Sequence, residues 1–213
     1  MSEVTETVAP TVFIVDDDAS ICAAMVNLLN SEGIAATPFS STEDFFEQWQ
    51  PALPGCLLLD VRRPGITGVE FQEILRDEGI SIPIIFMTAY GDVPTVRRVM
   101  KAGAIEFLTK PFQKEELLAA VHHAFELDRS RRIEASSLQT LQARFDSLTP
   151  REREVMALVT AGLLNKQIAG ELTLSEITVK LHRRQVMEKM KANSLADLVR
   201  SAENLKKSSY TKG

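Results

Sequence analysis

Short apolar runs alternate with segments of helical periodicity through the first 128 residues of the chain. The runs are four to six residues long, as in buried strands, whereas Ile21, Met25, Leu28 and Leu29 repeat at the spacing of one helix face. We predict strands at 11–15, 34–39, 55–59, 82–87 and 105–108, and helices at 20–31, 42–49, 68–78, 94–102 and 113–127. The order of elements is therefore (βα)5.

The predicted strands are apolar on both faces and are separated by helices, which is typical of a parallel sheet covered on both sides. With right-handed crossovers, such a chain forms a doubly wound, flavodoxin-like α/β domain, to which we assign residues 1–128. Ligands of open parallel sheets bind at the carboxyl ends of the strands. Functional residues are expected there.

Residues 129–147 form a polar segment without proline or glycine, so we predict a helical linker. Its apolar residues recur at spacings of three and four and are Leu138, Leu141 and Phe145, continued by Leu148. This stripe fits a short coiled-coil seam between two chains, and it equally fits a helix that packs on its own domain.

Only helical patterns follow, and we assign residues 148–213 to a small all-α domain. A first helix is indicated by Thr149 as its cap, Pro150 at its first position and Glu152 three residues after the cap.

Two further helices, at 165–172 and 176–190, are separated by a short turn, and we expect Asn165 and Ser175 to cap them. This pattern predicts a helix-turn-helix. A last helix is predicted from Ser194, followed by a disordered tail.

The net charge of −5 is divided unevenly along the chain. Residues 1–130 contain 20 acidic and 9 basic residues, a net charge of −11, whereas residues 131–213 contain 9 acidic and 15 basic residues, a net charge of +6. The first part is expected to repel polyanions and the second to attract them.

Membrane and secretory features are not found in the sequence. No apolar run approaches the ~20 residues of a membrane span, and the amino terminus lacks the apolar core of a signal peptide, so we expect a cytoplasmic protein without a membrane partner. The two cysteines, Cys22 and Cys56, are not spaced as in a disulfide framework or a zinc site, and we expect both to be buried.

Acidic residues gather at the predicted strand ends. Asp16, Asp17 and Asp18 follow the first strand, and Asp60 follows the third. Carboxylates crowded into one crevice repel one another unless a cation lies between them, and oxygen donors of this kind suit Mg²⁺ or Mn²⁺. Any one of these acids is also explained as a helix cap, Asp18 above all.

Phosphoryl chemistry is indicated by the other strand ends. Thr88 follows the fourth strand and Lys110 the fifth, and a hydroxyl beside a lysine suits phosphate. Asp60 stands alone after the apolar run CLLLD and precedes a loop, VRRPGITG, whose proline and glycines are expected to let the backbone approach the site. We predict that Asp60 is a carboxylate nucleophile that accepts a phosphoryl group.

Residues 10–128 resemble the receiver domains of two-component response regulators through FIVDDD, LLLDVRRPGITG, FMTAYGD and FLTKPF. The resemblance implies that Asp60 is the phosphoacceptor and that Asp18 is a spare acid. It implies a metal site made of Asp16, Asp17, Asp60 and the backbone carbonyl of Arg62. Thr88 and Lys110 would contact the phosphoryl group, and Phe107 would be the aromatic residue that moves with Thr88 in the phosphorylation switch. Arg63 departs from the family pattern, in which an apolar residue is usual at that place.

The predicted second helix of the helix-turn-helix carries basic and apolar residues together. The basic residues are Lys180, Arg183, Arg184 and Lys189, and the apolar ones are Ile177, Leu181 and Met187. Basic side chains on such a helix reach DNA phosphates and guanine edges in the major groove, although a basic helix face is also often only solvated.

The same part of the chain resembles the LuxR/FixJ type of helix-turn-helix domain through LTPREREV, GLLNKQIA and TVKLHR. The resemblance implies that Lys180, Leu181 and Arg184 face the bases. It assigns the phosphate contacts to Lys166, Thr178, Arg183 and Lys189. The apolar stripe of the last helix would serve dimerisation on DNA, or simply packing.

Together the two parts resemble the FixJ/NarL group of response regulators, and FixJ and StyR-like members most of all. The resemblance implies a transcription factor that is not a conventional enzyme, because its catalysis is limited to self-phosphorylation and slow autodephosphorylation. The implied partners are a sensor histidine kinase, promoter DNA, a second copy of the chain after phosphorylation, and RNA polymerase.

Three other functions compete with this one. A receiver that only docks partners, without phosphate, is disfavoured by the intact set of pocket residues. A metal-dependent phosphohydrolase would be favoured by an acid two residues after Asp60, where Arg62 stands. An RNA-binding antiterminator would lack the helix-turn-helix pattern.

Overall fold

The computed structural model of the protein describes residues 8–61, 66–89 and 93–211. The chain divides into two compact units, residues 1–131 and residues 132–213. The first unit contains two apolar clusters and the second contains one.

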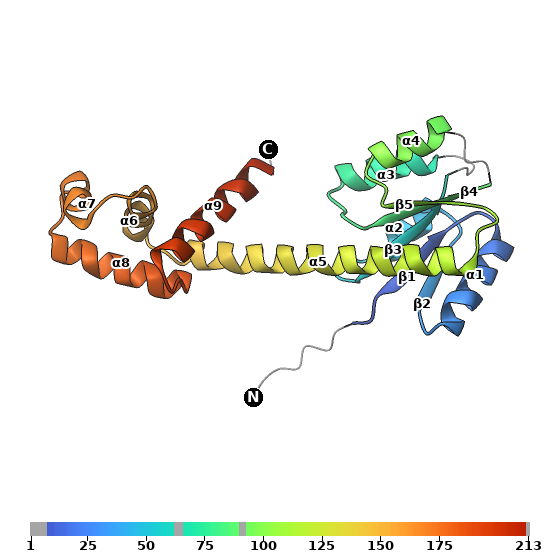
Figure 1. Ribbon diagram of the computed structural model, residues 1–213, viewed down its shortest axis with the longest axis horizontal. Helices are drawn as coiled ribbons and strands as arrows, with labels where there is room; N and C mark the ends of the chain where they lie inside the picture. The colour runs from blue at the N-terminus through green and yellow to red at the C-terminus, as the bar shows by residue number, and fades with distance from the viewer. Residues whose placement is uncertain (1–7, 62–65, 90–92, 212–213) are drawn as a thin grey trace. The chain divides into compact units, whose positions relative to one another are not determined.

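The first unit is built on a parallel sheet of five strands in the order β2-β1-β3-β4-β5 (Figure 1). Its strands are β1 (Thr11–Val15), β2 (Ala35–Phe39), β3 (Gly55–Asp60), β4 (Ile84–Thr88) and β5 (Glu106–Thr109). Its helices are α1 (Ala19–Ser31), α2 (Thr42–Gln48), α3 (Gly68–Asp77), α4 (Val93–Lys101) and the beginning of α5 (Lys114–Asp146). This architecture confirms the predicted doubly wound (βα)5 fold.

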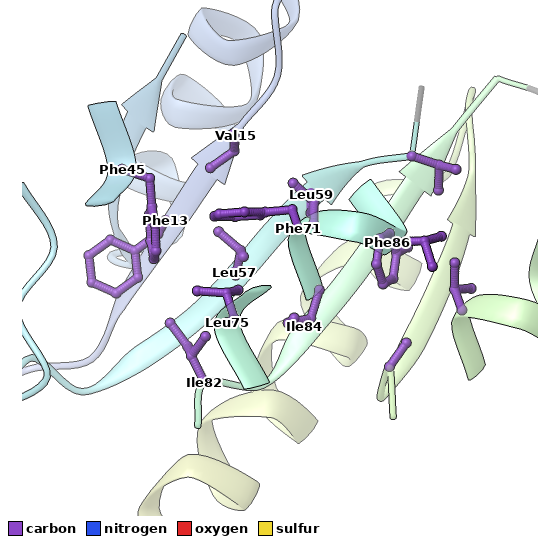
Figure 2. Packing of buried hydrophobic residues seen from close by; sticks show 14 of the residues in the cluster. Phe13, Val15, Phe45, Leu57, Leu59, Phe71, Leu75, Ile82, Ile84 and Phe86 are labelled. Carbon is purple, nitrogen blue, oxygen red and sulfur yellow. The ribbon is translucent and has the colours of Figure 1, made fainter. Parts of the chain in front are cut away.

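Helices cover both faces of the sheet, and each face has its own apolar cluster. Side chains from α2, α3 and α4 pack on one face, where Phe45 and Phe71 meet Phe13 and Leu57 of the strands (Figure 2). Side chains from α1 and α5 pack on the other face. Every residue of β3 and β4 is buried, because both strands lie inside the sheet between these layers.

The ends of the strands differ slightly from the prediction. The fourth strand was predicted at 82–87 and is observed at Ile84–Thr88. Ile82 is buried although it precedes the strand, and Pro83 has no N–H to donate to a neighbouring strand. Both cysteines are free and buried, as predicted.

The predicted helical linker is part of α5, a single helix of 33 residues that extends from Lys114 to Asp146. Near its end, Leu141 and Phe145 pack against the apolar cluster of the second unit, and Leu148 is buried in that cluster. The apolar stripe was expected to be either a coiled-coil seam between two chains or a helix packed on its own domain. These contacts are those of a helix packed on its own domain.

The second unit is all-α, with α6 (Pro150–Thr160), α7 (Asn165–Leu172), α8 (Glu176–Met190) and α9 (Leu195–Thr211) following α5 (Figure 1). The predicted capping box at Thr149 and Glu152 is present, and Ser175 caps α8 as predicted. In the described residues, no helix is both long and apolar enough to cross a lipid bilayer.

Two expectations for this unit are wrong. Asn165 is the first residue of α7 and not its cap, since its side chain accepts a hydrogen bond from Arg183. The cap position is Leu164, whose backbone N–H donates to the side chain of Gln167. The tail expected to be disordered instead continues α9 to Thr211.

Candidate functional site

The register of the sheet brings the carboxyl ends of four strands together. Val15, the last residue of β1, pairs with Leu59, so Asp16 follows beside Asp60 at the end of β3. Because the chain reverses its strand order between β1 and β3, the two acids flank the crevice where doubly wound sheets bind ligands.

A lysine joins these two acids. The Lys110 ammonium nitrogen Nζ lies 2.6 Å from Asp16 Oδ2 and 3.1 Å from Asp60 Oδ1. Asp16 is 3% exposed and Asp60 is 7% exposed, so both ion pairs are shielded from solvent. One ammonium group therefore spans the two carboxylates that the sequence singled out.

The protonation of Lys110 follows from this environment. Burial on its own lowers the pKa of Lys110, but hydrogen bonds to Asp16 and Asp60 and the charges of both acids outweigh it and raise the pKa above its ordinary value. Lys110 is therefore cationic at neutral pH, with its charge directed at Asp60.

The remaining acids of the run lie differently. Asp17 is exposed beside the pocket, and Asp18 caps α1 by accepting from the backbone N–H groups of Ser20 and Ile21. The helix-cap explanation therefore holds for Asp18.

The donor chemistry of the pocket suits a hard divalent cation, since Asp16, Asp17 and Asp60 offer only carboxylate oxygen. No group of three or more acidic, histidine or cysteine side chains in the described part of the chain is assembled as a metal site. In this arrangement Lys110 is bonded to two of the three predicted acidic ligands. Arg62, whose carbonyl was predicted to complete the site, and Arg63 lie outside the described residues.

The other two predicted residues of the pocket, Thr88 and Phe107, come from neighbouring strands. Thr88 ends β4 and is buried, and its carbonyl oxygen accepts from the backbone N–H of Lys110 over 2.7 Å. Phe107 pairs in register with Phe86 and is half-buried against the apolar cluster that contains Val99 of α4. Phe107 thus packs on the face of the sheet that α4 covers.

The beginning of α3 lies very close to the backbone of Asp60. A Cβ added at Gly68, the first residue of α3, would lie 2.8 Å from the carbonyl oxygen of Asp60 and 2.8 Å from the ring of Phe86. Only a glycine lets α3 begin this near the end of β3. The glycines of the loop after Asp60 were predicted to let the backbone approach the site, and Gly68 is one of them.

The opposite end of β3 has a partner on α5 that was not predicted from the sequence. Asp128 on α5 is only 3% exposed, and its Oδ2 accepts from the backbone N–H of Gly55, the first residue of β3, over 2.9 Å. No local sequence pattern predicts the hydrogen bond between Asp128 and Gly55, because the two residues are far apart in the sequence.

The second candidate site is α8 of the all-α unit. Val179, Val186 and Met190 are buried, whereas Lys180 and Arg184 lie on the opposite, exposed side. Leu181 lies on that side too and is 54% exposed. The three residues predicted to face bases thus share one solvent-facing surface.

The four predicted phosphate contacts have different surroundings. Lys166 is exposed near the start of α7. The Thr178 hydroxyl lies 2.8 Å from that of Ser175. The guanidinium of Arg183 donates to Asn165 over 2.7 Å. The ammonium of Lys189 lies 2.7 Å from the buried carboxylate of Glu152, within the domain itself.

Two family models match the chain. The model for the response regulator receiver domain matches residues 12–122. The model for bacterial regulatory proteins of the luxR family matches residues 146–202.

Relatives match over nearly the full length. The chain is 48% identical over 194 residues to nodulation protein W of Bradyrhizobium diazoefficiens, covering 91% of this chain and 86% of the relative. It is 43% identical over 200 residues to the response regulator protein TodT of Pseudomonas putida, covering 94% of this chain and 88% of the relative.

Solved structures of response regulators also match nearly the full length of the chain. The response regulator StyR matches with a TM-score of 0.82 and 47% identity, over 92% of this chain and 98% of StyR. Full-length FixJ from B. japonicum matches with a TM-score of 0.56 and 38% identity, over 93% of this chain and 98% of FixJ.

Proposed function

Since the chain belongs to the FixJ/NarL family of two-component response regulators, transcription factors with a receiver and a LuxR-type helix-turn-helix domain, we propose that phosphorylation of Asp60 controls its dimerisation and its binding to promoter DNA. The protein is not a conventional enzyme. The observation that carries the proposal is the Lys110 ammonium group between the buried carboxylates of Asp16 and Asp60.

The proposed transfer starts from a phosphohistidine of the partner kinase. A carboxylate oxygen of Asp60 attacks phosphorus, the phosphorus–nitrogen bond of the donor breaks, and the histidine leaves with its electron pair. Lys110 stabilises the negative charge that arrives on Asp60, and its raised pKa keeps it protonated for this role. Hydrolysis of the aspartyl phosphate by water later restores the carboxylate.

Receiver domains typically use Mg²⁺ for phosphorylation, and the oxygen donors of this pocket fit Mg²⁺ or Mn²⁺. We assign Asp16, Asp17, Asp60 and the carbonyl of Arg62 as its ligands. The bound ion would shield the negative charge of the carboxylates and of the incoming phosphoryl oxygens.

The switch is proposed to involve two residues beside the pocket. The Thr88 hydroxyl turns toward the phosphoryl group on Asp60, and Phe107 packs into the space that it leaves. Because Phe107 contacts the apolar cluster that includes Val99 of α4, its movement alters the surface of α4 and β5. We propose that two phosphorylated receivers pair through this surface.

Family membership implies a partner sensor kinase and DNA binding. We propose that Lys180, Leu181 and Arg184 contact base edges and that Lys166, Thr178 and Arg183 contact phosphates. Lys189 is proposed as a further phosphate contact, and its ammonium group also pairs with the buried Glu152. RNA polymerase is a further proposed partner, and the cytoplasm is the proposed location.

The decisive experiment compares the wild type with Asp60→Asn. After incubation with Mg²⁺ and a small-molecule phosphodonor, intact mass and oligomeric state are recorded. We expect the wild type to gain one phosphoryl group and dimerise, and the variant to do neither. Asp77→Asn is the matched control, since its side chain is 76% exposed on α3, and it should behave as the wild type. A wild type that binds DNA without gaining phosphate would favour a docking-only receiver.

A further inference from the structure

Ile177 lies in the first turn of α8 and is 80% exposed. It is more exposed than Leu181, which follows one helical turn later at 54%. Their spacing of four residues puts both side chains on one face of the helix. Two large apolar side chains thus lie next to each other, facing solvent, on the helix assigned to DNA.

This apolar pair lies among cations. Lys180 and Arg184 are three and seven residues after Ile177, on the same exposed face, and the buried stripe of α8 is on the opposite side. The guanidinium nitrogen Nε of Arg184 donates a hydrogen bond to the carboxylate of Glu188 over 2.9 Å, and both side chains are exposed to solvent. An apolar protein partner would have to strip water from both cations, whereas a duplex would pair each of them with phosphate or a base edge.

The major groove offers one apolar group, the 5-methyl of thymine, and the residues at the start of a recognition helix reach the base edges. We propose that Ile177 is a specificity-determining residue that packs against a thymine methyl, with Leu181 against a neighbouring base. This inference rests on the proposed DNA-binding function and adds a requirement on the DNA: each half-site contains a thymine whose methyl group is read by Ile177.

The experiment uses the full chain, phosphorylated with a small-molecule donor, and a random-sequence DNA duplex library. From the duplex that the wild type enriches, each thymidine is replaced in turn by deoxyuridine, which removes only the methyl group. Burying a methyl group is worth about a fourfold change in affinity. We therefore expect one deoxyuridine per half-site to weaken the wild type about fourfold and to leave Ile177→Ala unaffected.

Leu181→Ala and Ile133→Ala complete the set. Ile133 on α5 is another exposed isoleucine, at 58%, so its variant should keep the wild-type profile. If Ile177→Ala shows the wild-type response to deoxyuridine at every position, the inference is overturned while sequence-selective DNA binding stands. If the wild type enriches no sequence at all, the proposed DNA-binding function fails together with it.

Discussion

At the scale of single residues, the helical domain depends on a buried charge. Glu152 is 2% exposed, and its carboxylate accepts from Lys189 and from the backbone N–H of Thr149. Burial on its own raises the pKa of Glu152, but these hydrogen bonds outweigh it and hold the pKa below its ordinary value. A carboxyl group with a lower pKa in the folded state stabilises the fold above its ordinary pKa, and the stabilisation is lost as the pH falls through the folded value.

We therefore predict that Glu152→Gln lowers the stability of the helical domain at neutral pH by about 1 kcal/mol, a value reduced by the partial exposure of Lys189. The difference from the wild type should shrink as the pH falls below about 5. Thermal unfolding by circular dichroism between pH 3 and pH 8 measures it. The single tryptophan, Trp49, follows the receiver separately by fluorescence.

Glu154→Gln serves as the control, because Glu154 pairs with Arg151 at the surface and is 51% exposed. Its effect should be small and nearly independent of pH. A loss of stability in Glu152→Gln that is the same at every pH would mean that shape, and not charge, is what the domain requires there.

At the scale of elements, the position of α3 depends on one missing side chain. The helix begins at Gly68, next to the carbonyl of Asp60 and the ring of Phe86. We predict that Gly68→Ala destabilises the receiver by about 1–3 kcal/mol, because α3 or the end of β3 must shift. Phosphorylation of Asp60 should also slow several-fold. Trp49 fluorescence during unfolding and the rate of mass gain with a phosphodonor measure the two effects.

Gly170→Ala is the matched control for that substitution. A Cβ at Gly170 in α7 would meet no atom within 4 Å, so the change should be neutral or stabilising through helix propensity. Unchanged stability and phosphorylation in Gly68→Ala would show that the approach of α3 to Asp60 relaxes without cost.

The elements also show what the sequence could predict. The type and order of the helices and strands could be predicted from the periodicity of apolar residues. The ends of the strands were the least well predicted, because a residue such as Ile82, which precedes β4, is as apolar and buried as the residues of the strand. The cap at Ser175 was predictable because it depends on a hydrogen bond within the same helix. The side chain of Asn165 also accepts a hydrogen bond, but from Arg183, which lies on another helix. Asp128 with Gly55 and Lys189 with Glu152 were missed for that reason: each pair exists only after folding.

At the scale of the whole molecule, acidic and basic residues are divided unevenly between the two parts of the chain. Residues 1–130 have a net charge of −11 and residues 131–213 a net charge of +6, counted along the sequence. A single helical domain can contact only the DNA phosphates within reach of its own basic residues. Phosphorylation is proposed to bring two such domains to the same DNA, so the number of phosphates contacted should double.

That doubling is measurable from salt dependence. The logarithm of the DNA association constant falls linearly with the logarithm of salt concentration, with a slope of about −0.9 for each phosphate contacted. We predict that the slope for the phosphorylated wild type is about twice that of Asp60→Asn on the same duplex. Titrations at several potassium chloride concentrations measure both slopes, and intact mass verifies the phosphate. Equal slopes would mean that phosphorylation acts within one chain, by exposing a basic domain and not by pairing two.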